Sequence, residues 1–154
     1  MKIIAISGGI DTCKDKLAYR LAENSDVVYI KPYTDREVPI NLEVYEQDDL
    51  IHLSSEKLSR KMEREIPLTM ETVNGNRYVF FKNQCTADFC VMILDDAGIF
   101  NLKKNWSGEI ITVRVHSKNE RSSSRVLMKD SEYDFVFDWD KDDYHDLETA
   151  IEYR

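Results

Sequence analysis

The stretch from Gly8 to Asp15 holds residue types that can bind an anion. It follows an apolar run at 2–6, and Lys14 opens a segment with apolar residues four positions apart. Backbone N–H groups at the start of a helix attract phosphate, and a lysine ammonium adds positive charge. Glycine lets the backbone approach a ligand closely. The sequence therefore predicts a strand, a phosphate-binding turn and a helix. The candidate phosphate ligands are Gly8, Gly9, Cys13, Lys14 and Asp15.

This turn is similar to a P-loop, in which glycine, four residues, glycine and lysine precede a serine or threonine. Cys13 replaces the second glycine, and Asp15 replaces the hydroxyl residue that normally meets Mg²⁺. Asp15 can approach the metal itself, but its charge and that of Asp11 weaken the binding of a triphosphate. Taken alone, the turn favours a plain strand–turn–helix with Lys14 in solvent.

The elements that position this turn follow from apolar periodicity. Strands are predicted at 2–6, 27–30, 68–73, 77–82, 90–94, 110–115 and 135–137, and helices at 14–23, 56–65 and about 143–153. Asn74-Gly75 predicts a tight hairpin turn. Strands that alternate with helices indicate an α/β chain with a mostly parallel sheet and helices on both faces. Together with the turn that is similar to a P-loop, this pattern makes us expect the three-layer P-loop fold, as a single domain over 1–154.

Composition and charge exclude several kinds of partner. The net charge of −8 argues against a broad nucleic-acid surface, which needs a basic footprint. No apolar run approaches 20 residues, so we expect no membrane partner. Three cysteines without metal spacing fit reduced thiols, and we expect a cytoplasmic protein.

Several segments in register resemble guanylate kinase. Val91 to Gly98 is similar to the family's apolar strand that ends in an acidic residue, two residues and glycine. Further similar segments lie at 31–39, 51–58, 66–69, 74–78 and 133–138. The resemblance covers most of the chain. It implies a substrate-binding insert at about 33–84 and a shortened lid at about 117–132.

The resemblance also implies residues that bind the acceptor nucleotide. Arg36 and Tyr78 would contact its phosphate, and Thr34 would line the site. Thr69 stands where the family has a glutamate that reads the base, so the base is left open. The family's second arginine would fall near Pro39 and is missing.

The remaining implied roles concern the metal and the transferred group. Asp95, with Asp15, would hold Mg²⁺ beside the phosphates. Lys14 would act on the transferring phosphoryl group together with Arg121 and Arg125 of the lid. Asp95 is equally compatible with a surface residue at a strand end, and Arg36 with a surface ion pair.

Two functions remain open from the sequence. One is a nucleoside or deoxynucleoside monophosphate kinase that uses ATP and Mg²⁺. The other is a non-catalytic nucleotide- or protein-binding module on the same scaffold, because a fold does not fix a function. A homodimer or a protein partner fits either function. The small size and altered motifs would suit a phage or prophage protein.

Overall fold

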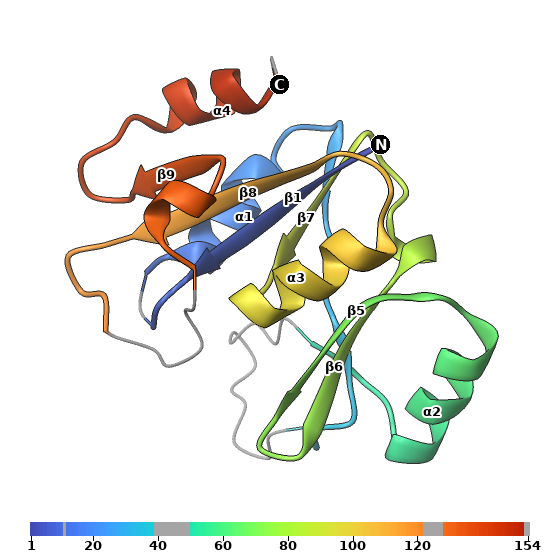
Figure 1. The fold of residues 1–154 in the computed structure, drawn as a ribbon. Helices are drawn as coiled ribbons and strands as arrows, with labels where there is room; N and C mark the ends of the chain where they lie inside the picture. The colour runs from blue at the N-terminus through green and yellow to red at the C-terminus, as the bar shows by residue number, and fades with distance from the viewer. Residues whose placement is uncertain (11, 39–49, 122–127, 153–154) are drawn as a thin grey trace.

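The centre of the molecule is a five-stranded sheet with the order β2-β7-β1-β8-β9 (Figure 1). A computed structural model of the chain describes residues 1–10, 12–38, 50–121 and 128–152. The strands of this sheet are β1 (Lys2–Gly8), β2 (Val27–Tyr29), β7 (Phe89–Ile93), β8 (Ile110–His116) and β9 (Phe135–Asp138). All four neighbouring pairs are parallel, so the carboxyl ends of the strands meet at one edge. That edge is where ligands bind in sheets of this kind.

Helices cover both faces of the sheet. Helices α1 (Lys14–Leu21) and α4 (Tyr144–Glu152) pack on one face with Ile4 and Ile6 of β1. Helix α3 (Asp96–Asn105) packs on the other face with Ile3. The expected three-layer α/β arrangement is confirmed. The sequence interpretation stopped at the end of β7 and missed α3, which begins directly after that strand.

A second sheet, with the order β4-β3-β6-β5, lies beside the first (Figure 1). Its elements are β3 (Tyr33–Thr34), β4 (Ile51–His52), α2 (Ser55–Arg64), β5 (Pro67–Val73) and β6 (Asn76–Phe81). Short 3₁₀ turns at Lys82–Gln84 and Asp130–Glu132 complete the described elements. The two short strands β3 and β4 were not predicted, because two residues give no detectable periodicity.

Local interactions account for the start of α2 and for the turn between β5 and β6. Ser54 caps α2, since its Oγ accepts a hydrogen bond from the backbone N–H of Lys57 at 3.2 Å. Asn74 and Gly75 take φ values of 51° and 81°, which is the left-handed geometry that a two-residue hairpin turn requires. Within the described residues, no helix has the length and apolar composition needed to cross a bilayer.

Arg77 holds the second sheet together through one guanidinium group. Its Nε lies 2.9 Å from Asp35 Oδ2, and its backbone N–H donates to Asp35 Oδ1 at 2.8 Å. Its Nη1 donates to Ser59 Oγ and its Nη2 to the carbonyl of Ser55, both on α2. Burial alone raises the pKa of Asp35, but the bonds from Arg77 outweigh it and lower that pKa. The side chain therefore joins β3, β6 and α2.

We expect Arg77→Gln to lower the free energy of unfolding by about 2 kcal/mol, because it leaves the nearly buried Asp35 carboxylate without its charged partner. Urea unfolding at neutral pH measures the loss. The lowered pKa of Asp35 adds stability above about pH 4, and this is lost as the pH falls through the folded-state pKa.

Arg60→Gln is the matched control, since Arg60 pairs with Glu56 on the exposed face of α2. Its cost should stay below about 0.5 kcal/mol. Equal losses in the two variants would contradict the role given to Arg77.

Candidate functional site

The phosphate turn runs from Gly8, the last residue of β1, to Lys14, the first residue of α1. Cys13 caps the helix with φ 65° and ψ 27°, the left-handed conformation that glycine adopts without strain. The turn therefore keeps the backbone geometry of a glycine at this position, although a side chain is present. For a residue with a Cβ, this conformation costs about 1–2 kcal/mol.

Thr12 fills the inside of the turn. Its side chain is buried, and its Oγ1 donates to the carbonyl of Gly9 at 3.1 Å. Lys14 folds back over the turn, where its Nζ donates to the carbonyl of Gly8 at 3.1 Å. A Cβ at position 8 would lie 2.6 Å from Thr12 Oγ1 and 2.8 Å from the carbonyl of Val115. Only glycine therefore fits at position 8.

The beginning of the expected lid packs directly on this turn. Ile10 and Arg121 form an antiparallel bridge with two backbone hydrogen bonds, of 3.2 and 3.0 Å. A Cβ on Gly9 would lie 2.6 Å from the carbonyl of Arg121, so this glycine is also required. Arg121 is thus brought to the turn, whereas Arg125 lies outside the described residues.

Two hollows meet at Asp15. The first, of about 520 Å³, lies at the start of α1. Its lining residues are Thr12, Cys13, Lys14, Asp15, Lys16 and Asn119. The second, of about 300 Å³, extends from Asp15 under the smaller sheet. It is lined by Asp15, Tyr29, Ile30, Pro32, Leu50, Glu71, Val73, Tyr78, Phe80 and Ile93.

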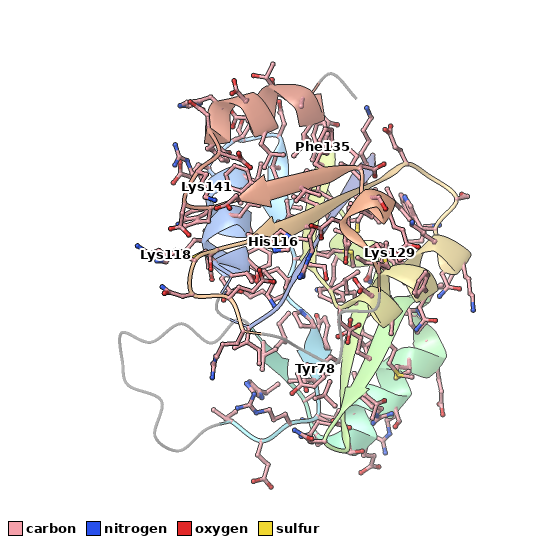
Figure 2. The ribbon with its side chains drawn as sticks, turned by 60° about the vertical axis from the view of Figure 1, so that its left-hand side comes forward. Tyr78, His116, Lys118, Lys129, Phe135 and Lys141 are labelled. Carbon is pink, nitrogen blue, oxygen red and sulfur yellow. The ribbon has the colours of Figure 1, made fainter. Side chains whose placement is uncertain are left out.

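The residues expected to bind an acceptor are only partly brought together. Tyr78 lines the second hollow and lies on the smaller sheet (Figure 2). Thr34 is buried, and its Oγ1 accepts from the backbone N–H of Arg36. Arg36 is exposed at the end of β3. Thr69 is buried and donates its hydroxyl hydrogen to the carbonyl of Gly98 at 2.8 Å, outside the lining of this hollow.

Glu71 is the charged lining residue that the sequence interpretation overlooked. Its Oε1 accepts from the backbone N–H of Asp95 at 3.0 Å, so the carboxylate lies at the start of α3 as well as in the second hollow. Glu71 stands two positions after Thr69 on β5, and alternate residues share one face of a strand. That alternation was the signal available to find it.

The two aspartates after β7 have different surroundings. Asp95 caps α3, because its Oδ1 accepts from the backbone N–H of Gly98 at 2.9 Å. Asp96 is fully buried and accepts from Ser7 Oγ, the backbone N–H of Met128 and the hydroxyl of Tyr133. Neither aspartate is among the residues that line the two hollows.

Both ends of the lid segment attach to β8 through a charge cluster of Arg114, His116, Glu120 and Asp130. Arg114 Nη2 lies 2.8 Å from Glu120 Oε1, and its Nε lies 3.7 Å from Asp130. His116, at the end of β8 in Figure 2, has Nδ1 2.6 Å from Glu120 and Nε2 3.0 Å from Asp130. Burial alone lowers the pKa of His116, but its bonds to the two carboxylates outweigh burial and raise that pKa.

Comparisons with known proteins identify the architecture. No family model matches the sequence, and neither does any curated protein. Among solved structures, the crystal structure of guanylate kinase from Anaplasma phagocytophilum is similar with a TM-score of 0.65 and 16% sequence identity. The match covers 98% of this chain and 82% of that one. This chain has a guanylate kinase-like P-loop fold. At this identity, the likeness shows the fold alone.

A guanylate kinase-like fold is compatible with ATP and Mg²⁺, and the residues at the turn fit both. Lys14 and Lys16 supply positive charge at the N-terminus of α1, where phosphate binds well. Across the described ranges, no three His, Cys, Asp or Glu side chains are grouped to hold a metal ion. Mg²⁺ beside phosphates needs only one or two carboxylates, and Asp15 is the carboxylate in the first hollow.

We expect Cys13→Gly to raise the free energy of unfolding by about 0.5–1 kcal/mol. Glycine removes the left-handed strain of about 1–2 kcal/mol, and its greater freedom in the unfolded chain offsets part of that gain. Urea unfolding measures the change. Cys13→Ala keeps both a Cβ and the positive φ, and should show no such gain. The same gain in the alanine variant would rule out backbone strain as its cause.

We expect the charge cluster to make stability depend on pH. The raised pKa of His116 means that its stabilisation is complete below about pH 6.5 and is lost as the pH rises through the folded-state pKa. Arg114 also pairs with Glu120 and Asp130, so the carboxylates keep one partner. In the unaltered chain, the urea midpoint should fall as the pH rises through this range. In His116→Gln, it should no longer fall.

His145→Gln serves as the control for this comparison, because His145 lies on α4 with a side chain that is 76% exposed. Its profile should follow that of the unaltered chain. An unchanged pH profile in His116→Gln would show that the cluster does not depend on the imidazole charge.

Proposed function

We propose that this chain is a nucleoside monophosphate kinase, which transfers a phosphoryl group from ATP to a nucleoside or deoxynucleoside monophosphate. The observation that carries the proposal is the meeting of two hollows at Asp15. A phosphoryl transfer needs a donor and an acceptor in line and close together. Two adjoining hollows at the carboxyl edge of a parallel sheet supply such a layout, which a site for a single ligand does not need.

The first hollow suits the donor. Lys14 would leave the carbonyl of Gly8 and turn toward the phosphates of ATP, while the N–H groups at the start of α1 face the same anion. Asp15, with bound water, would hold Mg²⁺. When bound, the metal would neutralise charge on the phosphate oxygens. Arg121 and Arg125 of the short lid would add positive charge over the transferring group.

The second hollow suits the acceptor. Tyr29, Tyr78 and Phe80 provide aromatic and apolar walls for a base and sugar. Arg36, exposed at the end of β3, is the cation proposed for the acceptor phosphate. An oxygen of that phosphate would form the new bond to the γ-phosphorus of ATP. The bond to the bridging oxygen would then break, with its electrons leaving on ADP.

One feature of the second hollow favours a different function. Its lining includes the carboxylates of Asp15 and Glu71 and no lysine or arginine among the described residues. Thr12 also occupies the inside of the phosphate turn. Both features weaken the binding of anions. They favour the second candidate, a non-catalytic module on this scaffold, in the form that binds a protein partner.

ADP formation distinguishes the two functions. We expect ADP release from ATP–Mg²⁺ to depend on one member of a panel of nucleoside and deoxynucleoside monophosphates. Lys14→Ala should lower the rate by at least about 100-fold, because it removes a cation that stabilises the transferring group. Lys103→Ala is the control, since Lys103 is exposed in the last turn of α3, outside both linings.

Calorimetry on the same samples separates binding from turnover. Nucleotide binding without ADP formation across the whole panel would reject the kinase and leave the nucleotide-binding module. The absence of both binding and turnover would reject every nucleotide function, and would leave a protein-binding module.

A further inference from the structure

The side chain of Glu120 lies directly on the phosphate turn. A Cβ on Gly9 would lie 3.0 Å from Glu120 Oε1 and 3.3 Å from its Cγ. The same Oε1 accepts a hydrogen bond from Arg114 Nη2 at 2.8 Å. The other oxygen, Oε2, lies 2.6 Å from His116 Nδ1. One carboxylate therefore contacts the turn, a guanidinium group and an imidazole.

Arg114 is a buried cation whose donors are only partly used. Its exposed fraction is 6%. Its Nη1 has no hydrogen-bond acceptor within the described part of the chain, and its Nε lies 3.7 Å from Asp130, beyond hydrogen-bond distance. A guanidinium group presents five N–H donors in a planar fork that fits a carboxylate or a phosphate. A phosphate group has more oxygen atoms than a carboxylate and satisfies more of these donors.

The position of this pair in the fold connects it to the proposed donor site. Arg114 is the register partner of Ser7 on β1, and the turn begins at the next residue, Gly8. Asn119, which precedes Glu120 in the chain, lines the first hollow. The Glu120 side chain is 21% exposed, so it can rotate into solvent without crossing the core. Glu120 and Arg114 therefore meet beside the place where phosphates of ATP are proposed to bind.

Glu120 and a phosphate group compete for the same surroundings. Both are anions, so they repel each other when they lie close together. Both also accept hydrogen bonds from the same guanidinium fork. A phosphate can approach Gly9 and Arg114 only after the carboxylate has left.

We propose that Glu120 is an internal anion, which occupies part of the phosphate site and closes it until a nucleotide displaces it. On displacement, the Glu120 side chain turns to solvent and Arg114 donates to a phosphate oxygen instead. The exchange involves hydrogen bonds and ion pairs alone, and no covalent bond changes. The inference rests on the proposed phosphate binding at the turn, and it adds that the unliganded chain inhibits its own site.

Tripolyphosphate binding tests the internal anion without a base or sugar. Inorganic tripolyphosphate is titrated into the protein by calorimetry, without Mg²⁺. We expect Glu120→Gln to tighten its binding by at least about 10-fold, because the variant removes a negative charge in contact with the site. Circular dichroism verifies that the variant is folded. Unchanged or weaker binding in folded Glu120→Gln would overturn the proposal, and so would the absence of binding in every variant.

Glu109→Gln is the matched control, because it changes the net charge by the same amount. Glu109 pairs with Lys2 and stands just before β8, at the end of that strand away from the turn. The strand is about 20 Å long, which exceeds two Debye lengths at physiological salt. Binding should therefore change by less than about twofold. Equal tightening in both glutamine variants would show an effect of net charge and overturn the proposal.

A double-mutant cycle tests the transfer of Arg114 to the phosphate. When Arg114→Gln is already present, the further change Glu120→Gln should tighten binding by less than about threefold, since no guanidinium group is left to release. Arg114→Lys, which keeps the charge and loses the fork, takes its place if the glutamine variant does not fold. The same gain with and without Arg114 would overturn the transfer.

The ADP assay separates this proposal from the proposed function. ADP formation by the unaltered chain, with no tightening in Glu120→Gln, would overturn the internal anion and leave the kinase. Tighter tripolyphosphate binding in Glu120→Gln, with no ADP formed by any variant, would support the internal anion and reject the kinase.

Discussion

The buried side chain of Asp96 joins the segments on which both hollows depend. It stands at the start of α3 and accepts hydrogen bonds from Ser7 at the end of β1, from the backbone of Met128 and from Tyr133. A buried polar group is costly unless it is hydrogen-bonded, so these partners must come together for the chain to fold. Ser7 immediately precedes the turn that begins at Gly8, and Met128 lies within the expected lid at 117–132, where the described chain resumes. One buried carboxyl group therefore ties the turn, the helix and the lid into a single arrangement.

The charge cluster attaches the segment of the expected lid to β8. Arg114 and His116 project from β8 to Glu120 and Asp130, near the two ends of the lid segment. The bridge between Ile10 and Arg121 then holds the beginning of the same segment on the phosphate turn. Backbone hydrogen bonds thus join the turn to the first residues of the segment that the sequence analysis expects to be a lid.

Similarity to guanylate kinase and departure from the P-loop occur in different parts of the molecule. The fold is similar to that of a solved guanylate kinase over 98% of the chain, at 16% identity. Apolar patterning suffices for such agreement, because many apolar sequences fill the same core. The departures are concentrated where ligands would lie. Cys13 keeps a left-handed backbone, Thr12 fills the turn, and Glu71 adds a carboxylate beside Tyr78. Each departure changes the charge or space offered to a nucleotide, and none alters the layers.

The sequence by itself determined the parallel sheet, the glycine turn between β1 and α1, and the Asn74-Gly75 hairpin. Each of these is set by neighbours a few residues apart, through periodicity, backbone conformation or a local hydrogen bond. Helix α3 escaped detection because its first residues, Asp95 and Asp96, also read as the end of a strand. Only the tertiary structure decided that Thr69 bonds to α3, that Glu71 lines a hollow, and that Cys90 meets Met1. Those contacts join residues far apart in the chain, as Ser7 and Asp96 are at 89 positions, and no local pattern encodes which distant partner a side chain will meet.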